Sequence, residues 1–235
     1  MITIAVFNEA TGITDAQVQA MLPAFTIQWN RDLAPAWGID EVRFEFTPKG
    51  QPPTSGAWWL VWLDDSDQAD ALAYHDVTDE GLPLSKVFVK TIVADNASLS
   101  VAATHELCEM AVDPTINLAA QDQRGTFWAY ECADPVEDER YGYKIGDVLV
   151  SDFVLPAWFG YKSSKGPFDF RNHCTDAFQI LAQGYAQEFG QSGWSQVNGS
   201  RVTKTRAASA PTGSRRERRL RGTARWSRSR NRARL

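Results

Sequence analysis

Residues 100–114 read SVAATHELCEMAVDP, a run of small and apolar residues with a few ionisable ones set into it. Ser98 or Ser100 can cap the N-terminus of a helix here, because a serine hydroxyl accepts a bond from a first-turn N–H group. Pro114 ends the helix, since it disfavours the helical conformation of Asp113. The segment 96–114 therefore predicts a helix, and its apolar composition indicates that the helix is buried.

His105 and Glu109 lie four residues apart, so on a helix they project from one face about one turn apart. Zinc accepts both imidazole nitrogen and carboxylate oxygen, and this pair could grip one ion. Glu106 follows His105 directly and is placed to take a proton from a metal-bound water. The alternative is chance, because His-Glu-x-x-Glu specifies only three positions. The buried setting favours a metal site, since an unpaired buried carboxylate is costly.

Further ligands are available in residues 130–139, YECADPVEDE. Glu131 together with Asp134 could complete the coordination of the ion, and Glu137 lies close by in sequence. Asp113, at the end of the helix, is a nearer alternative. If several carboxylates bind together, calcium or magnesium replaces zinc as the expected ion. The same acids are also typical of a solvated turn.

The two remaining histidines have no spacing that assigns them a ligand role. His75 precedes the strand that leads into the helix, so we expect it to face the same cleft. His173 lies far along the chain, and no motif surrounds it.

The other segments predict an α+β fold with a mixed sheet. Alternation and β-branched residues indicate strands, whereas apolar residues at helical spacing indicate helices. The helix expected after the first strand begins at Thr14 or Asp15 and ends at Gly38. The apolar run 57–63 suggests a central strand covered on both faces. The expected strands are 2–10, 41–46, 57–63 and 86–93. The other expected helices are 14–38 and 174–190, and the second of these lies within a C-terminal part that is otherwise irregular.

The charge is divided unevenly along the 235 residues. Residues 201–235 hold 13 of the 24 lysine and arginine residues and one acid, Glu217, whereas 28 of the 29 acids precede them. We therefore expect a globular domain over residues 1–200, with 201–235 a basic tail that is disordered when alone. Arginine suits phosphate contacts, so the tail predicts binding to nucleic acid or an acidic partner. The candidate residues are Arg215, Arg216, Arg218, Arg219 and Arg221.

Composition also limits the setting of the protein. The chain is 43% hydrophobic with nine tryptophans, which supports a buried core. It has no apolar run of roughly 20 residues that could span a membrane. It also lacks the basic segment, apolar stretch and small-residue cleavage site that are typical of a signal peptide. Its three cysteines have no CxxC spacing. We expect a soluble protein in a reducing compartment, with no membrane partner.

Three stretches resemble an uncharacterised family found chiefly in bacteriophage and prophage genomes, which carries a His-Glu-x-x-Glu helix. They are THELCEMAVDP, YECADPVEDERYGYKIGDVLVSDFVLPAWF and ALAYHDVTDEGLPLSKVFV, and the likeness covers roughly residues 70–160. The layout also resembles the zincin fold of metallopeptidases, in which the last strands of a mixed twisted sheet precede an active-site helix. The resemblance implies metal-ligand roles for His105 and Glu109 and a general-base role for Glu106.

Two functions follow as expectations. The first is a zinc-dependent hydrolase of the metallopeptidase type, acting on a peptide substrate in the host cytoplasm. The second is a non-catalytic virion protein, a head, neck or tail component, that keeps a zincin-like scaffold and uses its tail as a basic anchoring arm on other virion proteins or nucleic acid. The sequence departs from the zincin pattern at position 109, which is Glu rather than His.

Overall fold

The structure is a computed structural model that describes residues 1–67, 71–160, 165–190 and 193–200. The predicted basic tail, 201–235, lies outside these residues. So do its candidate partner-binding side chains Arg215, Arg216, Arg218, Arg219 and Arg221. Within the described residues, no helix has the length and apolar character needed to cross a membrane.

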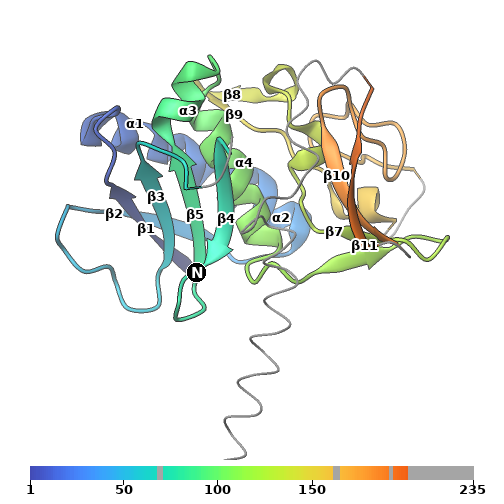
Figure 1. The fold of residues 1–235 in the computed structure, drawn as a ribbon, viewed down its shortest axis with the longest axis horizontal. Coiled ribbons are helices and arrows are strands. Elements are labelled where there is room, and N and C mark those ends of the chain that lie inside the picture. Colours follow the sequence, from blue (N-terminus) through green and yellow to red (C-terminus); the bar gives the residue numbers. More distant parts are fainter. Residues whose placement is uncertain (68–70, 161–164, 191–192, 201–235) are drawn as a thin grey trace, which may run out of the picture.

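The N-terminal half is built on a five-stranded sheet (Figure 1). Its mixed character was predicted, whereas its edge strand β4 was not. Its strand order is β2-β1-β3-β5-β4. The first four strands in this order run parallel, and β4 lies antiparallel to β5 at the edge. The bounds are β1 (Ile2–Asn8), β2 (Val42–Thr47), β3 (Trp58–Leu63), β4 (Ala73–Val77) and β5 (Pro83–Phe88).

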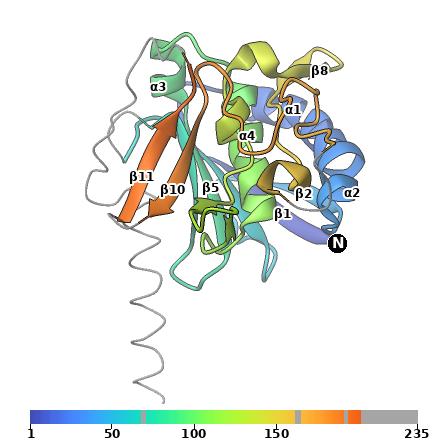
Figure 2. The same ribbon diagram turned by 90° about the vertical axis from the view of Figure 1, so that its right-hand side faces the viewer.

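A long helical segment connects β1 to β2, as the sequence predicted. It comprises α1 (Asp15–Ile27), the π-helical turn η1 (Gln28–Leu33) and α2 (Ala34–Trp37). Thr14 caps its start by accepting a bond from the Gln17 N–H group, and Gly38 ends it with a left-handed φ of 68°. Figures 1 and 2 show α1, α2 and α4 on one face of the sheet.

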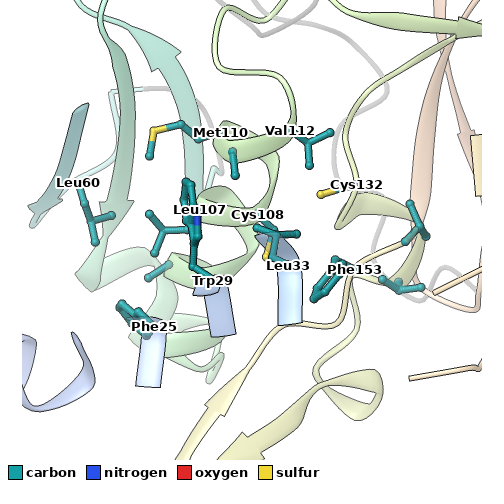
Figure 3. Close-up of a cluster of buried hydrophobic side chains, with 14 of the residues drawn as sticks. Phe25, Trp29, Leu33, Leu60, Leu107, Cys108, Met110, Val112, Cys132 and Phe153 are labelled. Carbon is teal, nitrogen blue, oxygen red and sulfur yellow. The ribbon is translucent and has the colours of Figure 1, made fainter. Parts of the chain in front are cut away.

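Helix α4 (Leu99–Val112) contains the His-Glu-x-x-Glu motif and lies in the centre of the molecule. Ser98 caps it by accepting a bond from Val101 N, and the helix ends just before Pro114. All residues from Ala103 to Val112 are buried. Figure 3 shows α4 between Leu60 of the sheet and Cys132 and Phe153 of the C-terminal half. A helix buried on all sides has no solvent-facing polar side, which explains why small and apolar residues surround its few ionisable ones.

Two predictions for the sheet need correction. The strand expected over 86–93 ends at Phe88, and α3 (Val89–Ala94) follows, with Val89 and Ile92 buried at helical spacing. The strand expected over 57–63 is central, but only one of its faces is covered by helices. Leu60 and Trp62 are fully buried on that face, whereas the alternate residues remain half-exposed.

The C-terminal half consists mainly of loops with short elements. It contains a four-stranded antiparallel sheet of order β11-β10-β7-β6 and a β8-β9 hairpin. The strands are β6 (Ala119–Gln121), β7 (Phe127–Ala129), β8 (Tyr143–Ile145), β9 (Val148–Val150), β10 (Tyr185–Gly190) and β11 (Gly193–Asn198). Single-turn 3-10 helices lie at η2 (Asp134–Val136), η3 (Glu139–Tyr141) and η4 (Pro156–Phe159).

The helix predicted over 174–190 does not form. Phe178 and Gln183 have positive φ angles of 57° and 72°, which are incompatible with a right-handed helix. Gly184 packs so closely on the loop after β7 that a Cβ atom there would lie 2.4 Å from the carbonyl oxygen of Pro135. Residues from Tyr185 then pair with β7 and β11 instead. Tertiary contact therefore overrides the helical pattern of this segment.

Candidate metal centre

His105, Glu109 and Asp134 form the first group of possible metal ligands. His105 Nε2 lies 3.3 Å from Glu109 Oε1 and 3.1 Å from Asp134 Oδ1. The i and i+4 positions on α4 place the first two side chains together, as the sequence predicted. Asp134 comes from η2, far from α4 in sequence, and its predicted place beside them is confirmed.

Glu109 also fixes the loop that carries Asp134. Its Oε1 atom accepts bonds from the backbone N–H groups of Ala133 and Asp134, at 3.3 and 3.2 Å. Backbone bonds from Val154 to Cys132 and from Leu181 to Pro135 hold the same loop from its other side. A carboxylate that orients the backbone beside another ligand acts as a positioning group for the site.

His75, Glu109 and Glu131 form a second group of possible ligands. In the β4–β5 register His75 lies opposite Ser85, and the Ser85 hydroxyl donates to the carbonyl of Glu106 on α4. Paired residues on adjacent strands share a face, so His75 also points toward α4. Its Nδ1 atom lies 3.5 Å from Glu109 Oε2, and its Nε2 atom lies 3.7 Å from Glu131 Oε2.

The structure places His75 beside the ligand side chains of α4, fully buried, although the sequence did not assign it as a ligand. The signal in the sequence that could have assigned His75 was its position just ahead of β5, because β5 packs beside α4. Asp113, the alternative ligand, instead accepts backbone bonds from Asn117 and Leu118. Neither Asp113 nor Glu137 belongs to a possible ligand group among the residues that the structure describes.

Glu106 lies beside the second group without belonging to either group. Its Oε2 atom is 3.3 Å from His75 Nδ1, and the side chain is 3% exposed. Glu106 is therefore close enough to the ligands to exchange a proton with a molecule bound there.

The electrostatics of the centre favour a positive charge. Four carboxylates, those of Glu106, Glu109, Glu131 and Asp134, meet two imidazoles, and every one of these side chains is between 0 and 7% exposed. Burial alone would lower the pKa of His105, but the Glu109 charge and the Asp134 hydrogen bond raise that pKa to about 10. Nitrogen and oxygen donors of this kind suit a divalent cation, so these buried groups could hold a metal ion.

A separate cluster contains His173, the other histidine that the sequence left unassigned. His173 Nδ1 lies 3.2 Å from Asp152 Oδ2 and 3.4 Å from Asp169 Oδ2. Asp152 accepts backbone bonds from Phe153 and Arg171, and Asp169 accepts them from His173 and Cys174. Burial and the neighbouring Asp169 raise the pKa of Asp152 to about 9. These two carboxylates hold together the loops that contain them.

No protein-family model matches the chain, and neither a curated protein nor a solved structure shows significant similarity to it.

Proposed function

We propose that this protein is a metal-dependent hydrolase of the metallopeptidase type, with a zincin-like fold and an origin in a bacteriophage. The observation that carries the proposal is the position of Glu106, which belongs to neither ligand group and whose Oε2 atom lies 3.3 Å from His75 Nδ1 in the second group. A buried carboxylate beside the ligands supports a role as the group that accepts a proton from a bound water. The passage from the last strand, β5, through α3 to α4 also agrees with the zincin layout.

The roles of the side chains follow from their contacts. His105, Glu109 and Asp134 would hold the ion, which when bound supplies a Lewis acid for the substrate carbonyl and lowers the pKa of a bound water. Glu106 would accept the proton of that water at Oε2. His75, whose Nδ1 atom lies 3.3 Å from Glu106 Oε2, orients this carboxylate. The Glu109 bonds to the backbone of Ala133 and Asp134 keep the third ligand in place.

Zinc is the ion we propose, because imidazole nitrogen together with carboxylate oxygen matches its preferences. Glu109 stands where a zinc peptidase of the usual pattern has histidine. A second anionic ligand reduces the charge that the ion presents to its water and so weakens the acidification of that water. We therefore expect slower hydrolysis than a site with two helix histidines would give.

The Glu106→Gln variant tests the proposed chemistry. It should retain the bound zinc and lose hydrolysis of a mixed peptide library, because an amide cannot accept the proton of the water. Glu80→Gln, at an exposed position outside the centre, is the matched control and should cleave at the wild-type rate. Equal cleavage by the Glu106 variant and the wild type would rule out this mechanism.

A non-catalytic role as a virion component is the second candidate, and the burial of the centre favours it. The ligand side chains are at most 7% exposed, so a substrate carbonyl would need an opening to reach them. In this role the ion stabilises the scaffold. Zinc binding without cleavage of any peptide in the library, by wild type and Glu106→Gln alike, would support this role over the hydrolase.

The basic segment 201–235 supports an anionic partner in either role, through virion proteins or nucleic acid. Thirteen basic side chains against one acid provide a long-range attraction that salt screens. Deleting 201–235 should remove a steeply salt-dependent affinity for double-stranded DNA. The same salt slope before and after the deletion would contradict a role of this segment in binding.

A further inference from the structure

The geometry points to a centre for two divalent cations, bridged by the carboxylate of Glu109. One ion would lie among His105, Glu109 and Asp134, and the other among His75, Glu109 and Glu131. This inference rests on the metal site of the proposed function and not on hydrolysis. It adds the second ion and assigns His75 and Glu131 to it.

Glu109 is the only residue that the two ligand groups share, and it faces them through different oxygen atoms. Oε1 lies 3.3 Å from His105 Nε2, and Oε2 lies 3.5 Å from His75 Nδ1. A carboxylate placed between two imidazoles in this way can give one oxygen to each of two ions. Bridged pairs of this kind in hydrolytic sites have ions roughly 3.5–4 Å apart.

The spacing within each group suits a separate ion. Donor atoms around a tetrahedral zinc lie about 3.3 Å from one another, given bonds of roughly 2.0–2.1 Å. In the first group the distances from His105 Nε2 are 3.1 and 3.3 Å, close to that value. In the second group, Glu109 Oε2 lies 3.5 Å from His75 Nδ1 and Glu131 Oε2 lies 3.7 Å from His75 Nε2. An ion there would take one of the two ring nitrogens, and one ligand atom from each of the three residues lies within 4.8 Å of the others.

Charge provides an independent argument for two ions. Glu106, Glu109, Glu131 and Asp134 contribute four negative charges when ionised, and all four are at most 3% exposed. With neutral imidazoles, one divalent ion leaves two of these buried charges uncompensated, whereas two ions neutralise all four. Uncompensated buried charge is strongly unfavourable, so the second ion is favoured.

The location of the elements explains why the second site is not visible in sequence. His75 comes from the edge strand β4, Glu109 from α4, and Glu131 from the loop between β7 and η2. These residues are separated by tens of positions, and only the packing of β4 and the loop against α4 brings them together. Each site offers one nitrogen and two oxygen donors, which suits zinc, cobalt and manganese.

The number of ions per chain tests the inference. Native mass spectrometry of the full chain, purified without chelator and titrated with Zn²⁺ alone, should show two ions for the wild type. Glu131→Gln and Asp134→Asn should each bind one. His173→Ala, in the separate Asp152 cluster, is the control and should still bind two. A wild-type chain that saturates at one ion would overturn the inference.

The bridge itself is tested with a paramagnetic ion. Protein loaded with two Mn²⁺ ions should give a spin-coupled electron paramagnetic resonance spectrum, and Glu109→Gln should lose the coupling. Two uncoupled ions in the wild type would overturn the bridge. Circular dichroism shows whether each variant is folded, and the wild-type count and spectrum stand without any variant.

Hydrolysis is measured on the same samples, so the two proposals can fail separately. Two coupled ions without peptide cleavage would retain the two-cation centre and reject the hydrolase. One ion with cleavage that depends on Glu106 would retain the hydrolase and reject the centre.

Discussion

Among the residues that the structure describes, two clusters of buried carboxylates with histidine differ in what the carboxylates contact. In the Asp152 cluster, the two aspartates accept backbone bonds from their own neighbourhood and meet one histidine that is 36% exposed. In the candidate metal centre, four carboxylates meet two buried histidines that come from different elements. Both clusters contain residues that could hold a metal ion, but only the second brings together two histidines.

The distinguishing property is the number and origin of the imidazoles. Backbone N–H groups satisfy Asp152 and Asp169 in place, and burial together with the neighbouring Asp169 raises the pKa of Asp152 to about 9. Glu109 also accepts backbone N–H bonds, from Ala133 and Asp134, but its carboxylate meets two imidazoles from different elements as well, those of His105 and His75. We therefore expect metal binding to change stability through the candidate metal centre and pH to change it through the Asp152 cluster.

Removal of Glu109 should have the largest effect. Glu109→Ala deletes the shared ligand and the acceptor of the Ala133 and Asp134 N–H groups. Breaking a buried ionic network by removing one member costs about 3–5 kcal/mol. Urea unfolding in the presence of zinc measures the loss. Glu80→Ala, which is exposed, should change stability little, and a comparably small change in Glu109→Ala would contradict the central role given to this residue.

Metal removal should have the next largest effect. A ligand present at 1,000 times its dissociation constant stabilises the folded state by about 4 kcal/mol. Chelation should therefore lower the Tm of the wild type and of His173→Ala by the same amount. His105→Ala should show a smaller decrease, because it retains only the ligand group of His75, Glu109 and Glu131. If chelation lowered the Tm of the wild type but not that of His173→Ala, the ion would belong to the Asp152 cluster.

A smaller effect is expected from crowding the ligand loop. Gly184→Ala would place a Cβ atom 2.4 Å from the Pro135 carbonyl oxygen and push the loop that carries Asp134. Overpacking typically costs about 1–3 kcal/mol. Zinc affinity, measured by competition with a chromophoric chelator, should fall as well. Gly190→Ala, which has open space around its Cβ position, is the control and should bind zinc like the wild type.

The smallest effect is expected from Asp152→Asn, and it depends on pH. The folded-state pKa of Asp152 is about 9 because of burial and Asp169, well above the value of about 4 in an unfolded chain. The protonated group therefore stabilises the folded state fully below pH 4, and this contribution decreases as pH rises toward 9. Asparagine keeps an acceptor oxygen and cannot ionise.

The Tm of Asp152→Asn should consequently fall less than that of the wild type between pH 5.5 and 8.5. The ionisable groups His173 and Asp169 face Asp152 and are present in both proteins. Their effect is removed by subtracting the Tm of the wild type from that of the variant at each pH. Parallel curves over this range would contradict the raised pKa of Asp152.

Local patterns in the sequence predicted much of the N-terminal half. The alternating residues of β1 and β2, the Thr14 cap, the Gly38 end and the boundaries of α4 depend on neighbouring residues, and the structure has them where they were expected. The prediction failed where long-range contacts decide the structure of a segment. Val89 begins a helix after β5 rather than extending the strand, and the segment 174–190 gives way to packing against Pro135.

The sequence by itself determined the pair His105 and Glu109, because four residues on a helix fix their relative direction. It also supplied Glu131 and Asp134 as acids in one short segment that could approach them. Only the tertiary structure decided that these acids belong to different ligand groups, that His75 joins one of them, and that Glu109 lies between the two. The physical reason is that a helix fixes directions over one turn, whereas ligands from a strand and a loop meet only through packing.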